Sequence, residues 1–350
     1  VDAYLTPHIR NYLESFRSGF SDNLEKTQLL FMQSDGGLTD SGNFKGSNAI
    51  LSGPAGGVVG YAMTTDLGQP VIGFDMGGTS TDVALLDGDL RLTQQGHIGP
   101  YPVAVPMVDM HTIGAGGGSL AYVDDAGLLH VGPHSAGADP GPACYGKGGT
   151  AATVTAANVV LGRLPESLLG GRMPLDTKAA EDVVGALGHP LNLDLYETAQ
   201  GIIDIVNENM FGALRLTTVQ RGLDLRNFSL VPFGGAGPLH ANALAMLGQC
   251  YPIIVPLTPG VLSALGFLNS SIRHEASRTL IRNLDDIEPN RIEQITSQLE
   301  NKVGQWLKEE GIALTDQAIR YEIDLRYLPQ GHELSLMFQV HDLENNLQTL

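Results

Sequence analysis

The segment Asp75-Met-Gly-Gly-Thr-Ser-Thr-Asp82 places two carboxylates around a glycine pair and three hydroxyl side chains. Adjacent glycines let backbone N–H groups approach a phosphate that a Cβ atom would keep away, and the hydroxyls add further donors. The candidate phosphate-binding residues are Gly77, Gly78, Thr79, Ser80 and Thr81. Asp75 and Asp82 would repel a bare phosphate, so we expect them to hold a Mg²⁺ ion through water. An ordinary hairpin would need only the glycines, and the segment therefore predicts a phosphate loop with a catalytic pair of aspartates.

A second glycine turn, Gly234-Gly-Ala-Gly237, follows an apolar run and precedes a helical pattern. The N–H groups at the start of a helix, together with the helix dipole, favour an anion or the edge of an adenine–ribose unit. Tight packing of a strand against a helix would require the same turn, so this pattern alone leaves both explanations open. We expect His240, one turn into the helix, to be a packing or capping histidine rather than a catalyst.

A third region collects metal-binding side-chain types beside the glycine loop Gly114-Ala-Gly-Gly-Gly-Ser119, which has the composition of another anion site. The candidate ligands for an additional divalent metal are Asp109, His111, Asp139 and Cys144, with His134 nearby in sequence. Their spacing matches no metal motif, and turn aspartates with a buried thiol are the alternative. No Gly-x-Ser-x-Gly elbow is present, which excludes the corresponding class of hydrolases.

Apolar periodicity indicates an α/β chain in which short buried strands carry the glycine loops. Helices are predicted at residues 2–18, 52–63, 195–220, 238–247 and 288–310. Strands are predicted at residues 29–32, 71–74, 83–86, 229–233, 252–256, 321–327 and 333–340. The strands before and after the first loop predict a β-hairpin whose turn binds a ligand. Near 270–285 the predicted pattern changes to alternating strands around one helix. We therefore expect one domain over 1–270 and the start of an α+β domain over 271–350.

The composition limits the classes of partner. The 350 residues are 43% hydrophobic and 17% charged, which suits a folded chain with a large core, and 44 glycines are nearly twice the usual share. A net charge of −18 disfavours nucleic acid and anionic membranes as partners. Cys144 and Cys250 stand far apart in sequence, and we expect a cytoplasmic location and no disulfide.

Several long motifs resemble the hydantoinase A / 5-oxoprolinase family, within the superfamily of actin, sugar kinases and heat-shock chaperone ATPases. The first loop resembles the second phosphate loop of that superfamily, and Gly234-Gly-Ala-Gly237 resembles its adenosine loop. The motifs specific to the family are Leu51-Ser-Gly-Pro-Ala-Gly-Gly57, Thr112-Ile-Gly-Ala-Gly-Gly-Gly-Ser119, Ser135-Ala-Gly-Ala-Asp-Pro-Gly-Pro-Ala-Cys-Tyr145 and Phe233-Gly-Gly-Ala-Gly-Pro-Leu-His240. They span about residues 1–270, and the tail Asp324-Leu-Arg-Tyr-Leu-Pro-Gln-Gly-His-Glu333 more loosely resembles the start of the family's C-terminal domain.

The resemblance implies a ribonuclease-H-like, actin-type ATPase half with inserted glycine-rich loops. It implies binding of ATP and Mg²⁺, phosphorylation of the carbonyl oxygen of a cyclic amide such as a hydantoin or 5-oxoproline, and ring opening by water. Gly77 to Thr79 would then hold phosphate, Gly234, Gly235, Ala236 and Gly237 would receive the adenosine, and a hydantoinase B-type subunit or domain would be the partner.

One feature departs from the superfamily pattern, which uses two phosphate loops. No second Asp-x-Gly-Gly-Thr occurs in the 350 residues, so we expect an internal piece that lacks the N-terminal half and is inactive alone. Two alternatives stay open: the ATP-using subunit of a ketone carboxylase, and a nucleotide-gated binding module without turnover.

Overall fold

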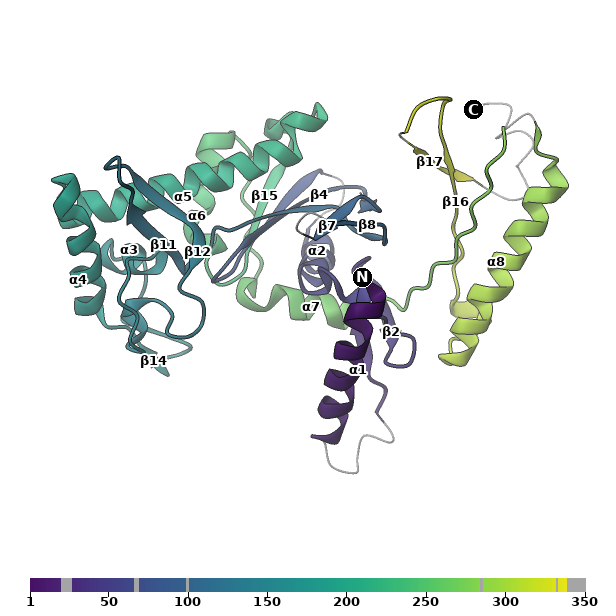
Figure 1. Cartoon of the computed structure of the whole chain (residues 1–350), viewed down its shortest axis with the longest axis horizontal. Coiled ribbons are helices and arrows are strands. Elements are labelled where there is room, and N and C mark those ends of the chain that lie inside the picture. Colours follow the sequence, from purple (N-terminus) through teal and green to yellow (C-terminus); the bar gives the residue numbers. More distant parts are fainter. Residues whose placement is uncertain (20–26, 66–68, 99–100, 284–285, 332, 339–350) are drawn as a thin grey trace. The chain divides into compact units, whose positions relative to one another are not determined.

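The computed structural model describes residues 1–19, 27–65, 69–98, 101–283, 286–331 and 333–338. The chain divides into two compact units, Val1–Ser271 and Ile272–Leu350. The glycine loops and both aspartates of the first motif belong to the first unit, which Figure 1 draws from purple to green.

A mixed five-stranded sheet forms the centre of the first unit. Its order is β10-β4-β3-β15, with β5 also paired to β4. The strands are β3 (Val71–Met76), β4 (Thr81–Asp87), β5 (Asp89–Leu90), β10 (Met110–Ile113) and β15 (Ser229–Phe233). The neighbours β3 and β4 form the predicted antiparallel hairpin, whereas β15 runs parallel to β3. The first glycine loop therefore lies at the hairpin turn, after the C-terminal end of β3. The Gly234 loop follows the C-terminal end of the parallel strand β15, so both loops lie at the same end of these strands.

Side chains of β3 alternate between two apolar layers, as a strand buried on both faces requires. Ile72, Phe74 and Met76 join a core that includes residues of helices α3 to α6. Val71 joins a second core with Tyr61 of α2 and Leu262 of α7. The sheet is thus covered on both faces, which fixes the hairpin and its turn.

Helices α1 to α7 belong to the first unit and α8 to the second. Their bounds are α1 (Asp2–Ser18), α2 (Ser52–Thr64), α3 (Val154–Val160), α4 (Thr177–Gly188), α5 (Leu195–Thr217), α6 (Gly237–Gly248), α7 (Leu262–Asn269) and α8 (Pro289–Glu309). Short 3-10 turns occur at Gly46–Ala49, Ala143–Tyr145, His189–Leu191, Val219–Arg221, Leu225–Asn227, Pro259–Val261 and Leu314–Asp316.

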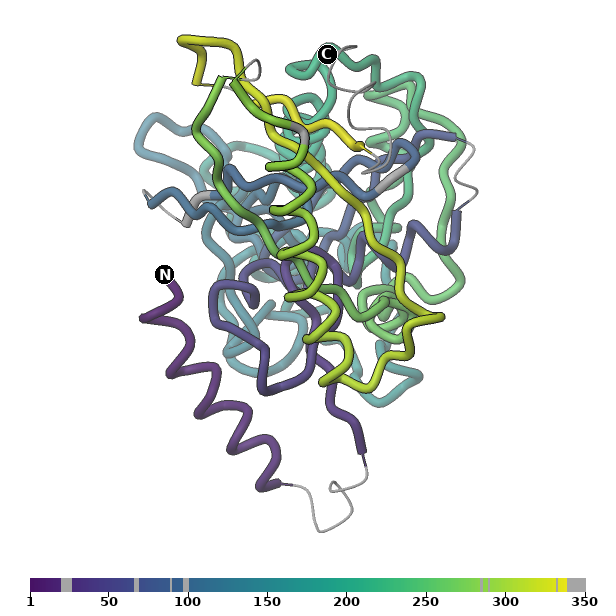
Figure 2. Tube along the Cα trace, turned by 90° about the vertical axis from the view of Figure 1, so that its right-hand side faces the viewer, coloured from purple at the N-terminus to yellow at the C-terminus, as the bar shows by residue number. Residues whose placement is uncertain are grey.

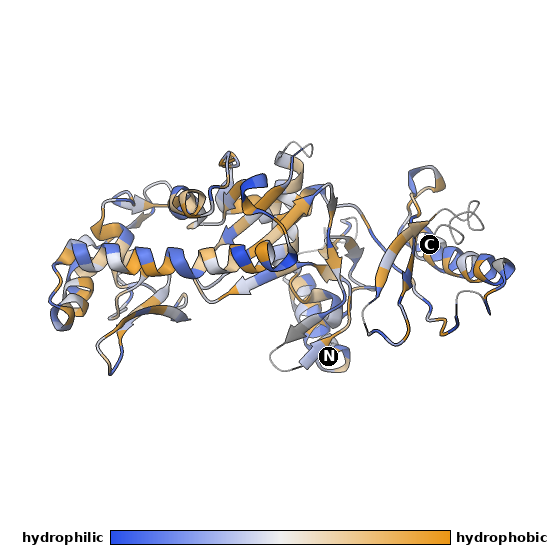
Figure 3. Cartoon of the chain, turned by 90° about the horizontal axis from the view of Figure 1, so that it is seen from above, coloured by the Kyte–Doolittle hydropathy of each residue, from blue (hydrophilic) through white to orange (hydrophobic). Residues whose placement is uncertain are grey.

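The long helix α5 is stabilised by a capping box at its start and by an apolar side that packs in the core. Asp194 accepts from the backbone N–H groups of Tyr196 and Glu197, and the Glu197 side chain accepts from the Asp194 N–H, which completes a capping box. Apolar and polar bands alternate along this helix in Figure 3, and its apolar side lies in the larger core.

The remaining strands form two-stranded sheets. They pair β1 (Leu30–Met32) with β2 (Leu38–Asp40), β6 (Leu92–Thr93) with β9 (Met107–Val108), β7 (Gly96–Ile98) with β8 (Tyr101–Val103), β11 (Ser119–Val123) with β12 (Leu129–Ser135), β13 (Ser167–Leu168) with β14 (Met173–Pro174), and β16 (Tyr321–Leu325) with β17 (Leu334–Phe338). The hairpin β16–β17 and helix α8 form the second unit, whose light green helix and yellow strands can be followed in Figure 2.

Most predicted elements are present, but the strand predicted at 252–256 is wrong. Only Ile253 forms a bridge, with Leu230 of β15, where the Pro252 carbonyl accepts from the Leu230 N–H. Prolines at 252 and 256 lack the N–H groups that a longer ladder needs. The last predicted strand is seen as β17, and residues 339 and 340 of that prediction lie outside the described residues. Within the described ranges, no helix combines the length and apolar character needed to cross a membrane.

Candidate functional site

The two predicted aspartates face each other across the hairpin. Asp75 on β3 and Asp82 on β4 are partners in the antiparallel register, immediately before and after the glycine turn. Residues directly opposite one another in such a pair have Cβ atoms about 4.5–5.5 Å apart, and side chains of the pair lie on the same face of the sheet. The Thr112 hydroxyl on β10 donates a hydrogen bond to Asp82 Oδ1. The fold therefore creates a pair of carboxylates, of which one has a dedicated donor.

Burial makes this pair costly without a cation. It raises the pKa of Asp75 to about 6, and the negative charge of Asp82 adds to the rise. Burial also raises the pKa of Asp82, although the Thr112 hydrogen bond opposes that shift. Two neighbouring carboxylates with raised pKa values fit a divalent ion with oxygen ligands, and Mg²⁺ often binds proteins through one or two carboxylates and water.

The turn between the aspartates exposes its backbone donors. Gly77 N–H bonds to the Ser80 carbonyl at 3.0 Å and closes the turn. The N–H groups of Gly78, Thr79 and Ser80 have no acceptor among the residues that the structure describes. Gly78 and Thr79 are exposed, and a Cβ atom at Gly78 would meet nothing within 4 Å. Three consecutive N–H groups without an acceptor among the described residues form a donor set that suits phosphate oxygens.

The Gly234 loop lies against this turn. Gly234 has φ +80°, and an added Cβ atom would clash with Asp75 Oδ1 and lie 2.5 Å from the Met76 carbonyl oxygen. The Ala236 N–H bonds to the same Met76 carbonyl at 2.9 Å. Gly235 is exposed with open space around it, and Gly237 begins α6 without a side-chain cap. The structure thus brings both predicted glycine loops together at Asp75.

The third glycine loop differs, because its N–H groups are used within the protein. Those of residues 115 to 119 donate, in order, to the Ile113 carbonyl, Ser119 Oγ, the Gly77 carbonyl, the Gly78 carbonyl and the Gly116 carbonyl. Residues 115 to 119 are all buried. The anion site suggested by the composition of this loop is therefore wrong: these donors have no freedom to bind a ligand.

His240 has the packing role that was predicted. It is buried on α6, and its Nδ1 lies 2.7 Å from Asn207 Oδ1 on α5. Because an amide oxygen only accepts, Nδ1 is the donor in this bond. Burial, with the nearby Arg163 charge, lowers the pKa of His240 to about 4. The bond joins the helix that follows the Gly234 loop to the central helix of the core.

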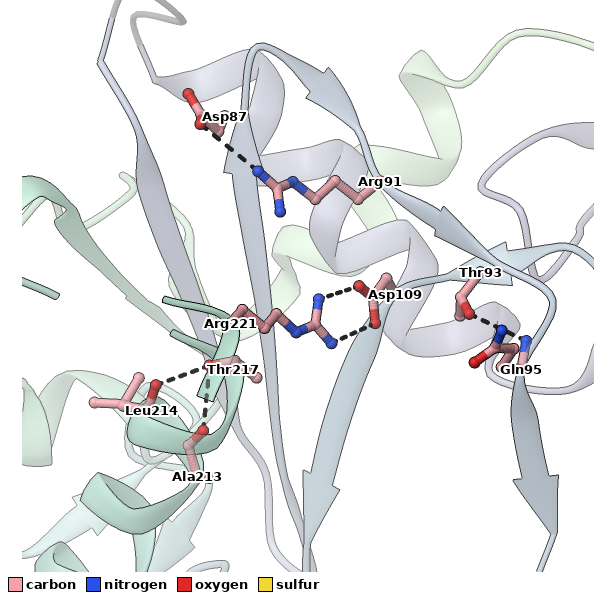
Figure 4. Close-up of polar contacts among 9 residues, drawn as sticks. All are labelled: Asp87, Arg91, Thr93, Gln95, Asp109, Ala213, Leu214, Thr217 and Arg221. Carbon is pink, nitrogen blue, oxygen red and sulfur yellow. Dashed lines mark hydrogen bonds and ion pairs between the residues drawn. The ribbon is translucent and has the colours of Figure 1, made fainter. Parts of the chain in front are cut away.

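The residues proposed for a second metal do not assemble. No group of three or more His, Cys, Asp or Glu side chains in the described ranges could hold a metal ion. Asp109 instead forms a two-bond ion pair with Arg221, in which Arg221 Nη2 lies 3.0 Å from Asp109 Oδ1 (Figure 4). His111 lies on β10 opposite Val83, Asp139 is exposed in a loop, and Cys144 is fully buried. The second-site prediction is corrected: a cationic side chain already neutralises its best carboxylate.

The two cysteines are both buried and free, which confirms the prediction of no disulfide. Burial raises the pKa of Cys144 to about 11 and also raises that of Cys250. Neither thiol is a reactive nucleophile at neutral pH, because the thiolate is the reactive form.

The predicted phosphate contact of Thr81 is corrected, because this residue is buried and its hydroxyl donates to the Ala115 carbonyl at 2.6 Å. Sequence reasoning missed two other hydroxyl groups that support the site. Thr112 donates to Asp82, and Thr155 donates to the Gly117 carbonyl at 2.7 Å. Thr112 and Ala115 belong to one motif that was noticed for its glycines, but no spacing rule links this motif to residues 77–82. Only the pairing of β10 with β4 brings them together.

Comparison with known proteins places these features in a family. The Hydantoinase/oxoprolinase family profile matches residues 1–276. The caprolactamase subunit alpha of Pseudomonas jessenii is 36% identical over 356 residues, covering 99% of this chain and 51% of that protein. The 5-oxoprolinase 1 of Arabidopsis thaliana is 38% identical over 358 residues, covering 96% of this chain and 28% of that protein.

A solved structure gives the same answer for the fold. The crystal structure of the ATP-dependent caprolactamase from Pseudomonas jessenii matches with a TM-score of 0.80 at 35% identity, covering 99% of this chain and 53% of that chain. This chain therefore spans about half the length of that relative and about a quarter of the plant 5-oxoprolinase. The match over most of the chain, in sequence and in fold, shows that it belongs to the hydantoinase/oxoprolinase family.

Proposed function

We propose that this chain is the nucleotide-binding part of an enzyme that uses ATP to open a cyclic amide, such as a lactam, 5-oxoproline or a hydantoin. Relatives named caprolactamase and 5-oxoprolinase support the substrate class, and the solved relative is called ATP-dependent. The observation that carries the proposal is the turn at 77–80, where three N–H groups without an acceptor among the described residues lie between two opposed carboxylates.

The residues of the chain divide the work as follows. The N–H groups of Gly78, Thr79 and Ser80 hold phosphate oxygens, and Asp75 with Asp82 holds Mg²⁺ through water. When bound, Mg-ATP supplies the phosphoryl group that activates the amide carbonyl oxygen, so that water can open the ring. Phosphoryl transfer is mostly positioning and charge neutralisation, which explains a site built from backbone donors and carboxylates without a nucleophilic side chain.

The adenosine is assigned to the loop at 234–237. Gly235 is exposed with open space around it, and the N–H groups of Gly235 and Gly237 have no acceptor among the described residues. The sheet supports the finer assignment to a ribonuclease-H-like, actin-type half, because one hairpin extended by β10 carries the phosphate loop and a parallel strand carries the adenosine loop. In this reading a second half grips the nucleotide from the other side, and a hydantoinase B-type subunit or domain completes the enzyme.

Product analysis of the full-length protein with its partner tests this function. We expect ring opening of at least one member of a panel of cyclic amides, with one ADP formed for each ring opened. Ring opening that does not need ATP would contradict the proposal. So would ATP-driven carboxylation of a ketone, with bicarbonate, in place of any amide hydrolysis.

The isolated 350-residue chain gives a second test. Removing half of a preorganised site removes transition-state stabilisation more than ground-state contacts. We therefore expect weak Mg-ATP binding, with a Kd on the order of 1 mM or above, and no phosphate release. Tight binding with steady hydrolysis by this chain alone would show that the two-sided site is wrong.

A further inference from the structure

We propose that the segment 112–119 is a positioning element that aims the donors of the phosphate loop, an inference that rests on the proposed function. The segment contacts the hairpin turn at four places. It accepts from Thr81, donates to the Gly77 and Gly78 carbonyls, and holds the Asp82 carboxylate through Thr112.

The geometry of the peptide bond explains how the segment acts. In a planar trans peptide the C=O and the following N–H point in opposite directions. Gly117 N–H bonds to the Gly77 carbonyl at 3.0 Å, and Gly118 N–H bonds to the Gly78 carbonyl at 2.6 Å. The N–H groups of Gly78 and Thr79 belong to these same two peptide units. The bonds to residues 117 and 118 fix the Gly77 and Gly78 carbonyls. The N–H groups of Gly78 and Thr79 therefore point away from the segment 112–119, and no described residue accepts from them.

Close approach of two backbones makes this contact specific to glycine. A Cβ atom at Gly116 would lie 2.6 Å from the Gly78 carbonyl carbon and 2.6 Å from the Thr79 nitrogen. Both atoms belong to the peptide that carries the Thr79 donor. A larger residue at 116 would thus displace the donor itself rather than a flexible side chain.

The segment 112–119 also accepts hydrogen bonds from residues outside the hairpin. Both the N–H and the hydroxyl of Thr155 donate to the Gly117 carbonyl at 2.7 Å, and the Ala136 N–H donates to the Gly118 carbonyl at 2.8 Å. Thr155 is the second residue of the buried helix α3, which packs against α5. The core of the unit therefore supports the segment, and the segment supports the phosphate loop.

The test is Gly116→Ala in the full-length enzyme, assayed with ATP and a cyclic amide. We expect kcat to fall at least 100-fold and the KM for ATP to rise at least tenfold, while the KM for the cyclic amide stays within twofold. A fall in the amount of folded enzyme would change neither KM. The matched control is Gly212→Ala on α5, where a Cβ atom meets nothing within 4 Å, and it should behave as wild type.

A second pair of variants decides the question if Gly116→Ala does not fold. Thr155→Val removes the hydroxyl bond to Gly117, and Thr155→Ser keeps it. We expect Thr155→Val to raise the KM for ATP several-fold and Thr155→Ser to restore it. If the wild type is active, an unchanged KM for ATP in folded Gly116→Ala, or in both Thr155 variants, overturns the positioning role and leaves the proposed function standing. A wild type without ATP-dependent ring opening overturns the proposed function as well.

Discussion

Two glycine-rich loops lie against each other in this molecule and use their glycines for opposite purposes. The turn at 77–80 is partly exposed, and three of its N–H groups have no acceptor among the described residues. The loop at 114–118 is buried from residue 115 onward, and each of its N–H groups from that residue on is bonded within the protein. In the first loop glycine leaves space for a ligand, whereas in the second it lets two backbones come together. Glycine content alone thus does not identify a phosphate site; the partners of the N–H groups do.

The largest expected effect comes from the aspartates beside the exposed turn. Asp75→Asn in the full-length enzyme should lower kcat about 100- to 1,000-fold, because losing one electrostatic contact to a transferring group costs about 2.7–4 kcal/mol. The unfolding midpoint should not fall, since the buried carboxylate is itself unfavourable. Steady-state kinetics and thermal unfolding measure both. Asp87→Asn, which alters an exposed pair with Arg91 at 3.6 Å, is the control. Wild-type turnover in Asp75→Asn would end the assignment of the phosphate loop.

The second effect is on stability and depends on pH. The folded chain binds a proton at Asp75 up to about pH 6, whereas the unfolded chain releases it near pH 3.8. The free energy of unfolding should therefore fall as the pH rises from about 4 to about 6, by up to about 2 kcal/mol after allowance for partial exposure. Urea denaturation without Mg²⁺ should show this slope in wild type and a smaller one in Asp75→Asn. Equal slopes in the two proteins would show that burial does not raise the pKa of Asp75.

The third effect exchanges the glycine at the tip of the exposed turn. Gly78→Ala adds a methyl group that meets nothing within 4 Å, so the unfolding midpoint should stay the same. A phosphate in the turn would meet this methyl group, and we expect Mg-ATP to bind about tenfold more weakly, which corresponds to about 1.4 kcal/mol. Calorimetric titration of the full-length protein measures the change. Unaltered affinity would mean that the tip of the turn is not where phosphate binds.

The smallest effect concerns the link between the two loops at Thr112. Thr112→Val removes the hydroxyl that donates to Asp82, and Thr112→Ser keeps it. Because the threonine is exposed, the bond is at the weak end of the usual range, and kcat should fall about threefold, or about 0.7 kcal/mol. The serine variant should recover most of the loss. If serine and valine lower kcat equally, the hydroxyl has no part in holding Asp82.

The sequence predicted the parts of the site that are local. The run from Asp75 to Asp82 contains the adjoining ends of both strands, the turn and both carboxylates, so local sequence predicts the hairpin and its turn. The turn at 234–237 was ambiguous until the parallel pairing of β15 with β3 placed it against Asp75. Local patterns therefore predicted the elements, and long-range pairing decided their use.

What the sequence could not show depends on contacts between distant residues. Asp109 and Arg221 are 112 positions apart, and no sequence pattern predicts that this arginine forms an ion pair with a candidate metal ligand. The loop at 114–118 has the same composition as an anion site, and only the positions of the Gly77 and Gly78 carbonyls show that its donors are occupied. At 252–256 the three apolar residues between the prolines favour a strand, whereas the prolines at both ends limit the pairing to a single bridge.

Hydrogen–deuterium exchange in the full-length protein, with and without Mg-ATP, tests the central claim most directly. Without nucleotide, the amides of residues 78–80 should exchange quickly and those of residues 115–119 slowly, because only the latter are bonded and buried. Mg-ATP should protect residues 78–80 and leave 115–119 nearly unchanged. Unchanged exchange at 78–80 under saturating Mg-ATP would contradict the account, and so would protection gained at 115–119 instead.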